Sequence, residues 1–418
     1  MKAPGLPGSC RLAGRWQAPA GCRRWALILI ALTFSSCCCA VDTQLSGYAT
    51  LGMACFDEPE AQFAINAQNR GPGRENRCDA GLDSIVAVQL NSQFNETLEA
   101  VLQAEASRDV DNQWSPSVRN ALLIWRPLER LYARLGRSSN PNFLYSESRD
   151  LRYVMPWARP PPEVYGVSPN LQYDGVDVAW RLPGAAANAE LQVGLARSRL
   201  DGTISGGTAE PVRFTQGFLI ASAEWARLRL KLSHVQGRVT FRPNSVEGLL
   251  ALLRLDSPAA ADLADSLVID DHPFQVSAAG AHWTSKDWSV HAEVSHRPRI
   301  GFFRAQRGAY ISLGRHWDDW SITATQAVRR SFGPTDAAQA GALQPFVRGL
   351  LDATRYDNDS SSLSVVRQLR AGIRLKLQLD WISPRPGSFG PYVNHTNDYP
   401  RDRPNAARLI ALNLDLVF

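Results

Sequence analysis

The chain has 418 residues, of which 45 are basic and 40 are acidic. The first forty residues carry five of the basic side chains and no acidic one, so removing them leaves 40 basic against 40 acidic residues. This balance provides no basic surface of the kind that binds nucleic acid, and we therefore expect no nucleic-acid partner.

The N-terminal segment has the pattern of a secretory signal peptide. Basic side chains precede an apolar run, Trp25–Phe34, and small residues lead to Ala40. About ten apolar residues are too few for a membrane helix, which needs about 20. A lipoprotein site at Cys37 is the alternative. The sequence therefore predicts a signal peptide over 1–40 and a mature domain over 41–418.

Two cysteines follow this leader, Cys55 and Cys78. Export to an oxidising compartment favours a disulfide between them. The bond would close a loop of about 23 residues, which contributes roughly 3 kcal/mol in the chain-entropy model. Two unpaired thiols are the alternative, because spacing alone fixes no geometry.

Segments of about ten alternately polar and apolar residues recur along the mature chain, which is the pattern of membrane-crossing strands. No segment after residue 41 is apolar for long enough to form a membrane helix, so only strands could cross a bilayer. Seven short turns separate eight long connections, which join sixteen strands into an all-β, antiparallel transmembrane barrel. The long connections are expected at 56–82, 108–116, 138–170, 201–214, 237–272, 298–306, 331–361 and 384–405.

The connection at 138–170 contains six prolines. The run Pro160–Pro162 stiffens it as extended polyproline, which an outward flap would not need. We expect this third external loop to fold into the lumen as a constriction loop that exposes charged side chains to the passage. These side chains are Arg149, Asp150, Arg152, Arg159 and Glu163.

The long external connection at 237–272 contains a helix signal. Asn244 is a capping residue, and Glu247 follows it before an apolar run. We expect a short helix that packs over the mouth of the barrel.

Charged side chains on the polar faces of the strands are candidates for the pore wall. Side chains at every second position stack about 7 Å apart, so two basic rows on different strands could guide anions. Pairing of these cations with nearby acidic residues is an equally compatible interpretation, since the mature chain is neutral. The predicted pore-lining residues are Arg227, Arg229, Lys231, Arg374, Lys376, Asp380, Glu293 and His291.

The chain ends in an alternating strand. Leu414, Leu416 and Phe418 share one face, and Asn413 and Asp415 share the other. A bare apolar edge invites aggregation, and closure of a barrel removes that edge. This ending is typical of the assembly signal that the barrel-assembly machinery reads on outer-membrane barrels.

The stretch Tyr153–Tyr165, followed by Tyr173–Asp177, resembles a family of little-characterised proteobacterial porin-like outer-membrane proteins. The opening strand Gly47–Gly52 and the chain end at Phe418 also resemble the corresponding parts of these proteins. The resemblance implies a sixteen-stranded general-porin architecture in the outer membrane of a Gram-negative bacterium, an inward third loop and often a homotrimer. The loop at 138–170 departs from the best-known general porins in its Pro- and Arg-rich chemistry, so their selectivity does not transfer.

Catalytic signals are weak. The seven histidines are scattered, and Asp270, Asp271 and His272 lack a second pair of metal ligands. We therefore expect neither enzymatic activity nor a bound metal or cofactor. We expect a porin that lets small hydrophilic solutes or ions diffuse passively through a water-filled channel, and a preference for anions is one possible form of it. A structural or adhesive barrel plugged by its own loops is the alternative. Outer-membrane lipid is the expected surrounding.

Overall fold

The computed structural model describes residues 41–65, 70–168, 170–184, 187–202, 209–333 and 337–418. The predicted signal peptide lies outside these residues and stays a prediction. Within them, no helix has the length and apolar character needed to span a membrane.

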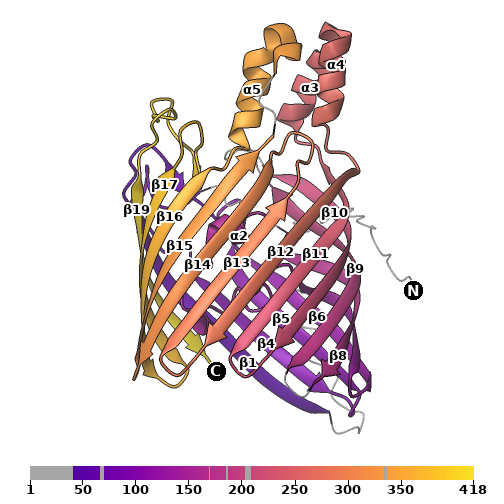
Figure 1. The fold of residues 1–418 in the computed structure, drawn as a ribbon, viewed down its shortest axis with the longest axis vertical. Coiled ribbons are helices and arrows are strands. Elements are labelled where there is room, and N and C mark those ends of the chain that lie inside the picture. The colour runs from indigo at the N-terminus through magenta and orange to yellow at the C-terminus, as the bar shows by residue number, and fades with distance from the viewer. Residues whose placement is uncertain (1–40, 66–69, 169, 185–186, 203–208, 334–336) are drawn as a thin grey trace, which may run out of the picture. The chain divides into compact units, whose positions relative to one another are not determined.

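Sixteen long antiparallel strands form one closed sheet, and the predicted barrel is confirmed (Figure 1). Its first half comprises β1 (Asp42–Phe56), β4 (Ile85–Gln93), β5 (Leu98–Arg108), β6 (Trp114–Leu128), β7 (Leu131–Ser139), β8 (Gln172–Pro183), β9 (Asn188–Gly202) and β10 (Glu210–Glu224). Its second half comprises β11 (Leu228–Phe241), β12 (His272–Thr284), β13 (Trp288–Arg297), β14 (Ala305–Trp317), β15 (Trp320–Phe332), β16 (Asn358–Arg370), β17 (Ile373–Pro384) and β19 (Ala407–Val417).

The connections alternate between long and short as predicted. Two of the long ones carry two-residue strands: β2 (Gln62–Phe63) and β3 (Cys78–Asp79) lie in the first, and β18 (Tyr392–Val393) lies in the last. The strands extend further than their sequence pattern indicated, and β11 continues to Phe241 where a loop was expected from residue 237. The ladder continues there, although the apolar side chains of Val239 and Phe241 now lie on the inner face.

The first and last strands meet at the seam of the barrel. β1 pairs with β19, and Tyr48 lies opposite Val417. The backbone groups of Gly47 and Phe418 exchange two hydrogen bonds of 3.0 Å. A Cβ atom on Gly47 would lie 2.4 Å from the Phe418 ring, so the absence of a side chain there gives the terminal ring its place. The terminal strand therefore closes the sheet, and no free edge remains at this seam.

The two faces of the strands differ in polarity. Leu232, Leu363, Leu377 and Leu412 are exposed on the outside, whereas the residue that follows each of them is polar and buried on the inner face. Exposed aromatic side chains lie beside the short turns, where amphipathic rings suit a membrane interface. They are Phe94, Trp125, Trp180, Trp225, Trp288, Trp317, Trp320 and Phe418.

Two polar side chains share the outer face with these apolar ones. Gln326 lies outward without a register shift and accepts a hydrogen bond of 2.6 Å from the Ser361 hydroxyl. Arg367 lies one residue before a register shift of β16 and places its guanidinium 4.9 Å from the centre of the Trp320 ring. Each outward polar group thus has a partner on a neighbouring strand.

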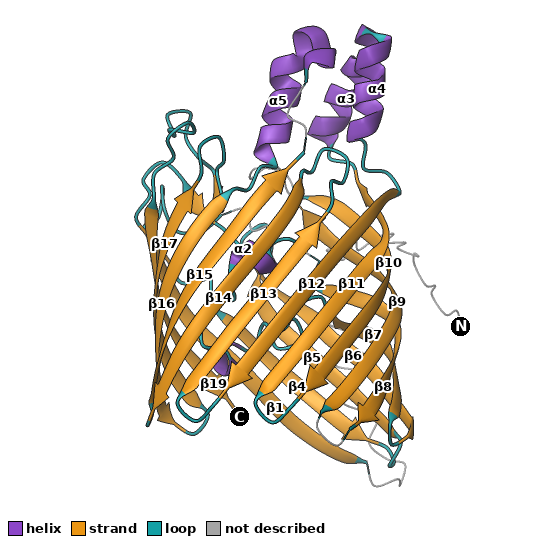
Figure 2. Cartoon of the chain, in the orientation of Figure 1, coloured by secondary structure: helices purple, strands orange, loops and turns teal. Residues whose placement is uncertain are grey.

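Helices occupy two of the external loops and the loop between β7 and β8 (Figure 2). The connection predicted to hold one short helix holds two, α3 (Asn244–Asp256) and α4 (Pro258–Leu267). A Pro at the first position of α4 ends one helix and begins the next, because its ring suits a helix start. The other helices are the 3-10 helices η1 (Arg152–Val154) and η2 (Ala338–Leu343), and the α-helices α2 (Pro162–Tyr165) and α5 (Gln344–Ala353).

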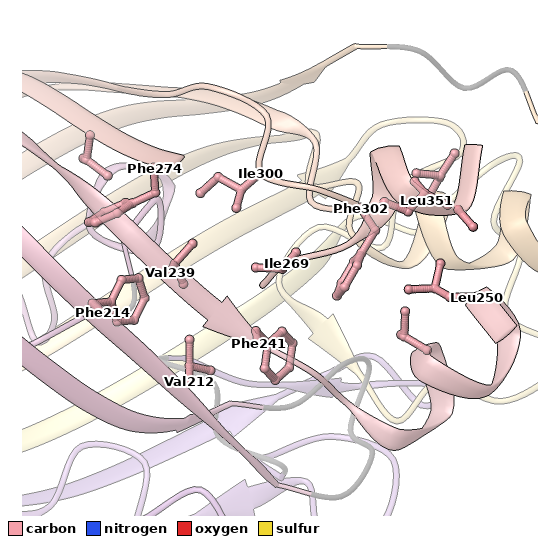
Figure 3. Close-up of a cluster of buried hydrophobic side chains, with 14 of the residues drawn as sticks. Val212, Phe214, Val239, Phe241, Leu250, Ile269, Phe274, Ile300, Phe302 and Leu351 are labelled. Carbon is pink, nitrogen blue, oxygen red and sulfur yellow. The ribbon is translucent and has the colours of Figure 1, made fainter. Parts of the chain in front are cut away.

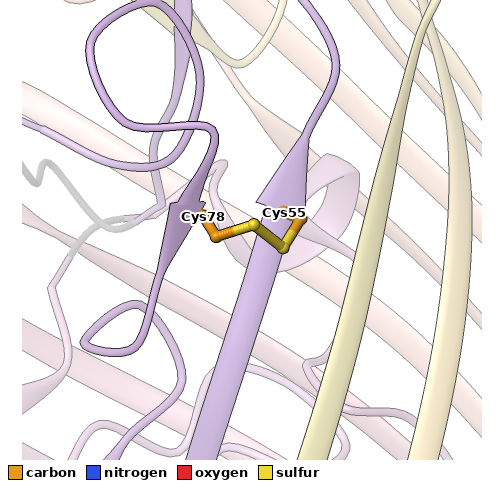
Figure 4. The surroundings of a disulfide bond; sticks show 2 residues. All are labelled: Cys55 and Cys78. Carbon is orange, nitrogen blue, oxygen red and sulfur yellow. A yellow bond between two sulfur atoms is a disulfide. The ribbon is translucent and has the colours of Figure 1, made fainter.

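A disulfide joins Cys55 of β1 to Cys78 of β3, and the two residues are partners in an antiparallel pair (Figure 4). It ties the first external loop to the outer end of β1.

We expect the double variant Cys55→Ser and Cys78→Ser to unfold with a free energy lower by about 3 kcal/mol, because the unfolded chain regains the entropy of an open loop. Urea titration of protein refolded in lipid vesicles measures the change. Adding dithiothreitol to the unaltered protein should produce the same shift and leave the double variant unaffected. Identical midpoints for the oxidised and reduced protein would contradict the prediction.

Candidate functional site

The connection between β7 and β8, residues 140–171, is called the internal loop below. Figure 2 shows its helix α2 within the ring of strands. The loop's aromatic side chains Phe143, Trp157 and Tyr165 are buried with apolar side chains of β12, β14 and β15. The indole nitrogen of Trp157 donates a hydrogen bond of 2.9 Å to the Thr325 hydroxyl on the inner face of β15. The loop therefore packs against one side of the barrel wall.

Asp83 anchors the internal loop from the first external loop. Its side chain is fully buried and accepts hydrogen bonds from Arg152 at 3.1 Å and from Nε of Arg159 at 3.0 Å. Arg159 also donates to Asp380 of β17 at 3.0 Å. Burial pushes the pKa of Asp83 up, but the two guanidinium groups outweigh it and hold that pKa below its usual value. Asp83 therefore carries a negative charge that two buried cations share, one of which also pairs with Asp380.

Lys376 forms a second anchor beneath η1. Its ammonium group is fully buried and lies 2.9 Å from a carboxylate oxygen of Asp415. It donates hydrogen bonds to the backbone carbonyl oxygens of Arg152 and, at 3.3 Å, Trp157 in the internal loop. The backbone N–H of Ala158 donates to Gln378 at 2.7 Å. Side chains of β17 and β19 thus satisfy backbone groups of the loop that burial would otherwise leave without partners.

Helix α2 has its own polar contacts with the wall. The Glu163 carboxylate accepts hydrogen bonds of 2.8 Å from both Asn358 and Ser360 of β16. Arg329 of β15 donates to the carbonyl oxygen of Gly166 at 2.9 Å. Burial raises the pKa of Glu163, and the two hydrogen bonds offset part of that rise.

The beginning of the internal loop contacts strands β11 and β13 of the barrel wall. The backbone N–H of Leu144 donates to Glu293 at 2.7 Å, and the Tyr145 hydroxyl hydrogen-bonds to Nδ1 of His291 at 2.6 Å. Lys231 donates to a carbonyl oxygen of the same segment at 3.0 Å. Three residues predicted to line the pore therefore hold the loop.

The prediction that the loop's charges face the passage is wrong for four of the five residues. Arg149, Arg152, Arg159 and Glu163 are each at most 9% exposed. Burial lowers the pKa of Arg149 to about 10. Asp150 is partly exposed and pairs with Arg119 of β6. The physical reason is that the loop packs against a polar wall, where Arg152 and Arg159 form ion pairs and Glu163 accepts hydrogen bonds, since a buried charge without partners is costly.

The two predicted basic rows are not continuous. Arg227 lies in the turn before β11. Arg229 lies on the strand, 3.4 Å from Glu224. Arg374 donates to the carbonyl oxygen of Tyr153 at 2.7 Å and stacks over its ring at 4.3 Å. Lys376 is buried beneath the loop. Pairing of these basic side chains with local partners therefore explains their positions better than two exposed basic rows along the pore wall do.

Two charged cavities lie on opposite sides of the internal loop. One, of about 760 Å³, is near the short turns, and the other, of about 330 Å³, is near the external loops. Among the described lining residues of each, the four basic side chains equal the four acidic ones in number. The first is lined by Arg130, Arg181, Arg229, Lys231, Glu129, Glu147, Glu190 and Glu224. The second is lined by Arg108, Arg119, Arg152, Arg199, Glu105, Asp109, Asp150 and Asp201.

Three of the histidines that look scattered in the sequence line one cavity of about 370 Å³. His282 and His291 stack with ring centres 4.2 Å apart, and His316 hydrogen-bonds to the Ser289 hydroxyl at 2.9 Å. Across the described ranges, no three His, Cys, Asp or Glu side chains are arranged to hold a metal ion.

Asp83 and Arg119 have central contacts that the sequence did not reveal. Asp83 lies in a long loop without a motif, and Arg119 is a single basic residue within a strand. Only the folding of the chain brings these two residues to the internal loop. The only local signal for either residue is the alternation of polar and apolar side chains along β6, which assigns Arg119 to one face of the strand.

Three solved structures share this fold. OmpF of Salmonella typhi, solved in complex with daunomycin, matches with a TM-score of 0.55 and 11% identity over 90% of this chain and 97% of that one. OmpT of Vibrio cholerae matches with a TM-score of 0.52 and 11% identity, over 92% of this chain and 99% of that one. An anion-selective porin from Comamonas acidovorans matches with a TM-score of 0.52 and 9% identity, over 90% of this chain and 100% of that one. No family model and no curated protein matches the chain. The chain therefore has the fold of sixteen-stranded outer-membrane porins.

Proposed function

We propose that this chain is an outer-membrane porin through which small hydrophilic solutes diffuse passively. The observation that carries the proposal is a closed barrel with an apolar outer face, a polar inner face and charged cavities on both sides of the internal loop. Lipid meets the outer face of such a barrel, and water and solutes meet the inner one. Assembly as a homotrimer and reading of the C-terminal strand by the assembly machinery stay predictions.

A structural barrel with a plugged lumen is the second candidate. The packing of the internal loop favours it, because Trp157, Ala158 and Glu163 are at most 1% exposed. Their contacts reach strands β15, β16, β17 and β19. A loop held at so many points would leave room for solutes only beside it.

Single-channel recording in a planar bilayer separates the two functions. The purified mature barrel, shown to be folded by its β-sheet circular dichroism, is expected to give open steps of constant size in potassium chloride. A folded barrel that inserts without conductance steps would overturn the porin proposal and favour the plugged barrel.

Ion selectivity follows from the charges that remain accessible. Because the two charged cavities are balanced, we propose that Arg229 and Lys231 supply at most a weak anion preference. The reversal potential in a potassium chloride gradient measures this preference. A strong selectivity of either sign would show that other groups control the passage.

A further inference from the structure

A fourth cavity, of about 320 Å³, lies at the external end of the barrel and differs in its chemistry from the two charged cavities. Three adjacent strands present apolar side chains to its interior, where a water-filled pore would ordinarily be polar. These side chains are Val212 and Phe214 of β10, Val239 and Phe241 of β11, and Phe274 and Val276 of β12. Figure 3 labels five of these side chains, all but that of Val276, within one cluster of buried hydrophobic residues.

Basic side chains line the same cavity. Of the described lining residues, Arg297, Arg329 and Arg355 are charged and none is acidic. Arg355 is neutralised by Asp357 at 2.5 Å. Among the described ion pairs, neither Arg297 nor Arg329 has a carboxylate within 4.0 Å. The cavity therefore combines an apolar wall with two cations that have no carboxylate in direct contact, and Glu163 acts on Arg329 only from a longer distance.

Both of these guanidinium groups are buried and incompletely bonded. Arg297 is 8% exposed and donates to the carbonyl oxygen of Arg304 at 3.2 Å, while its Nε has no hydrogen-bond partner among the described atoms. Arg329 is 6% exposed and stacks over the Tyr356 ring at 4.0 Å. It donates to Gln306 and to the carbonyl oxygens of Gly166 and Pro162, while its Nε lacks a partner in the described part of the chain. Buried cations without a paired carboxylate are costly, and a bound anion would reduce that cost.

We propose that this cavity is a binding site for aryl carboxylates, with the carboxylate at Arg297 and Arg329 and the ring against Phe214 and Phe274. The volume is within the range of small-ligand sites, which combine an apolar lining with a few polar groups that set orientation. Phe214 and Phe274 already pack edge to face at 5.1 Å, a geometry that a third ring can extend. The proposal rests on the porin function and names a solute class for it.

Equilibrium binding tests the site without relying on current. The probe is 3-phenylpropionate, titrated by calorimetry into the full mature barrel in detergent, with empty micelles subtracted. 3-Phenylpropylamine has the same ring with the opposite charge, and propionate has the same charge without a ring. We expect the aryl acid to bind at least tenfold more tightly than either control. Equal affinity for acid and amine would overturn the proposal, and this comparison needs no variant.

Two variants locate the site. Arg297→Gln is expected to weaken binding of 3-phenylpropionate about tenfold or more, because a hydrogen bond to a charged group is lost. Arg307→Gln is the matched control, since Arg307 is exposed on the outer face of the adjacent strand and its partner in the ladder is His296. Equal losses in the two variants would overturn the assignment. A barrel that conducts but does not prefer the acid disproves only this inference, and one that binds the acid but never conducts disproves only the porin function.

Discussion

Replacing Asp83 with Asn is expected to release the internal loop from the barrel wall. The substitution keeps the size of the side chain but removes the negative charge that accepts hydrogen bonds from Arg152 and Arg159. Arg159 retains Asp380, whereas Arg152 loses the only carboxylate among its described ion pairs. Breaking a buried ion pair on one side costs about 3–5 kcal/mol, because the remaining charge stays buried.

Two measurements report this release. Urea unfolding in lipid vesicles should show the lower stability, and single-channel recording should show larger or noisier open steps. Asp174→Asn is the matched control, since that carboxylate accepts from Arg137 at 2.7 and 2.8 Å but is more than half exposed. An exposed pair contributes about 1 kcal/mol or less. Equal effects of the two substitutions would refute the anchoring role of Asp83.

The pH dependence of this anchor follows from the lowered pKa of Asp83. A carboxyl whose pKa is lower in the folded than in the unfolded chain contributes stability above the unfolded value and loses it as the pH falls through the folded value. The ordinary value is 3.8. The difference in stability between the unaltered protein and Asp83→Asn is therefore expected to be constant from about pH 5 to 8 and to shrink only below about pH 4.

The architecture was predictable because it depends on repeated local signals. Alternation along each strand, the rhythm of turns and loops and the ending at Phe418 each indicate a barrel, and together they specify sixteen strands. Errors occurred where no local signal exists. β11 continues past residue 237, and the connection after it holds two helices rather than one.

The candidate site was less predictable, because its contacts join distant parts of the chain. The composition of the internal loop indicated a stiff inward segment, but not which of its charges would be paired. Lys376 and Arg229 look alike on alternating strands, yet one is fully buried against Asp415 and the other is exposed. Burial of a lumenal charge depends on where the loop lies, and sequence periodicity carries no information about that position.

Gly308→Val is expected to displace α2 from the wall, because the helix touches the backbone of β14 at this residue. A Cβ atom on Gly308 would lie 2.1 Å from the carbonyl oxygen of Glu163, far inside van der Waals contact. The helix cannot move aside freely, since Asn358 and Ser360 hold the Glu163 carboxylate and Arg329 bonds to the carbonyl of Gly166. Overpacking of this kind costs about 1–3 kcal/mol.

Gly217→Val is the control for this substitution, because it also places a branched side chain on a barrel strand. A Cβ atom there would be no closer than 3.4 Å to a neighbouring atom, which is ordinary van der Waals contact. We expect Gly308→Val, but not Gly217→Val, to lower the urea midpoint and change the size of the open steps. If both variants conduct like the unaltered protein, α2 does not narrow the passage and solutes cross on the side of the barrel away from β14. If Gly308→Val alone conducts more, the internal loop sets the width of the pore, and its contacts with β15, β16 and β17 determine how wide the pore can become.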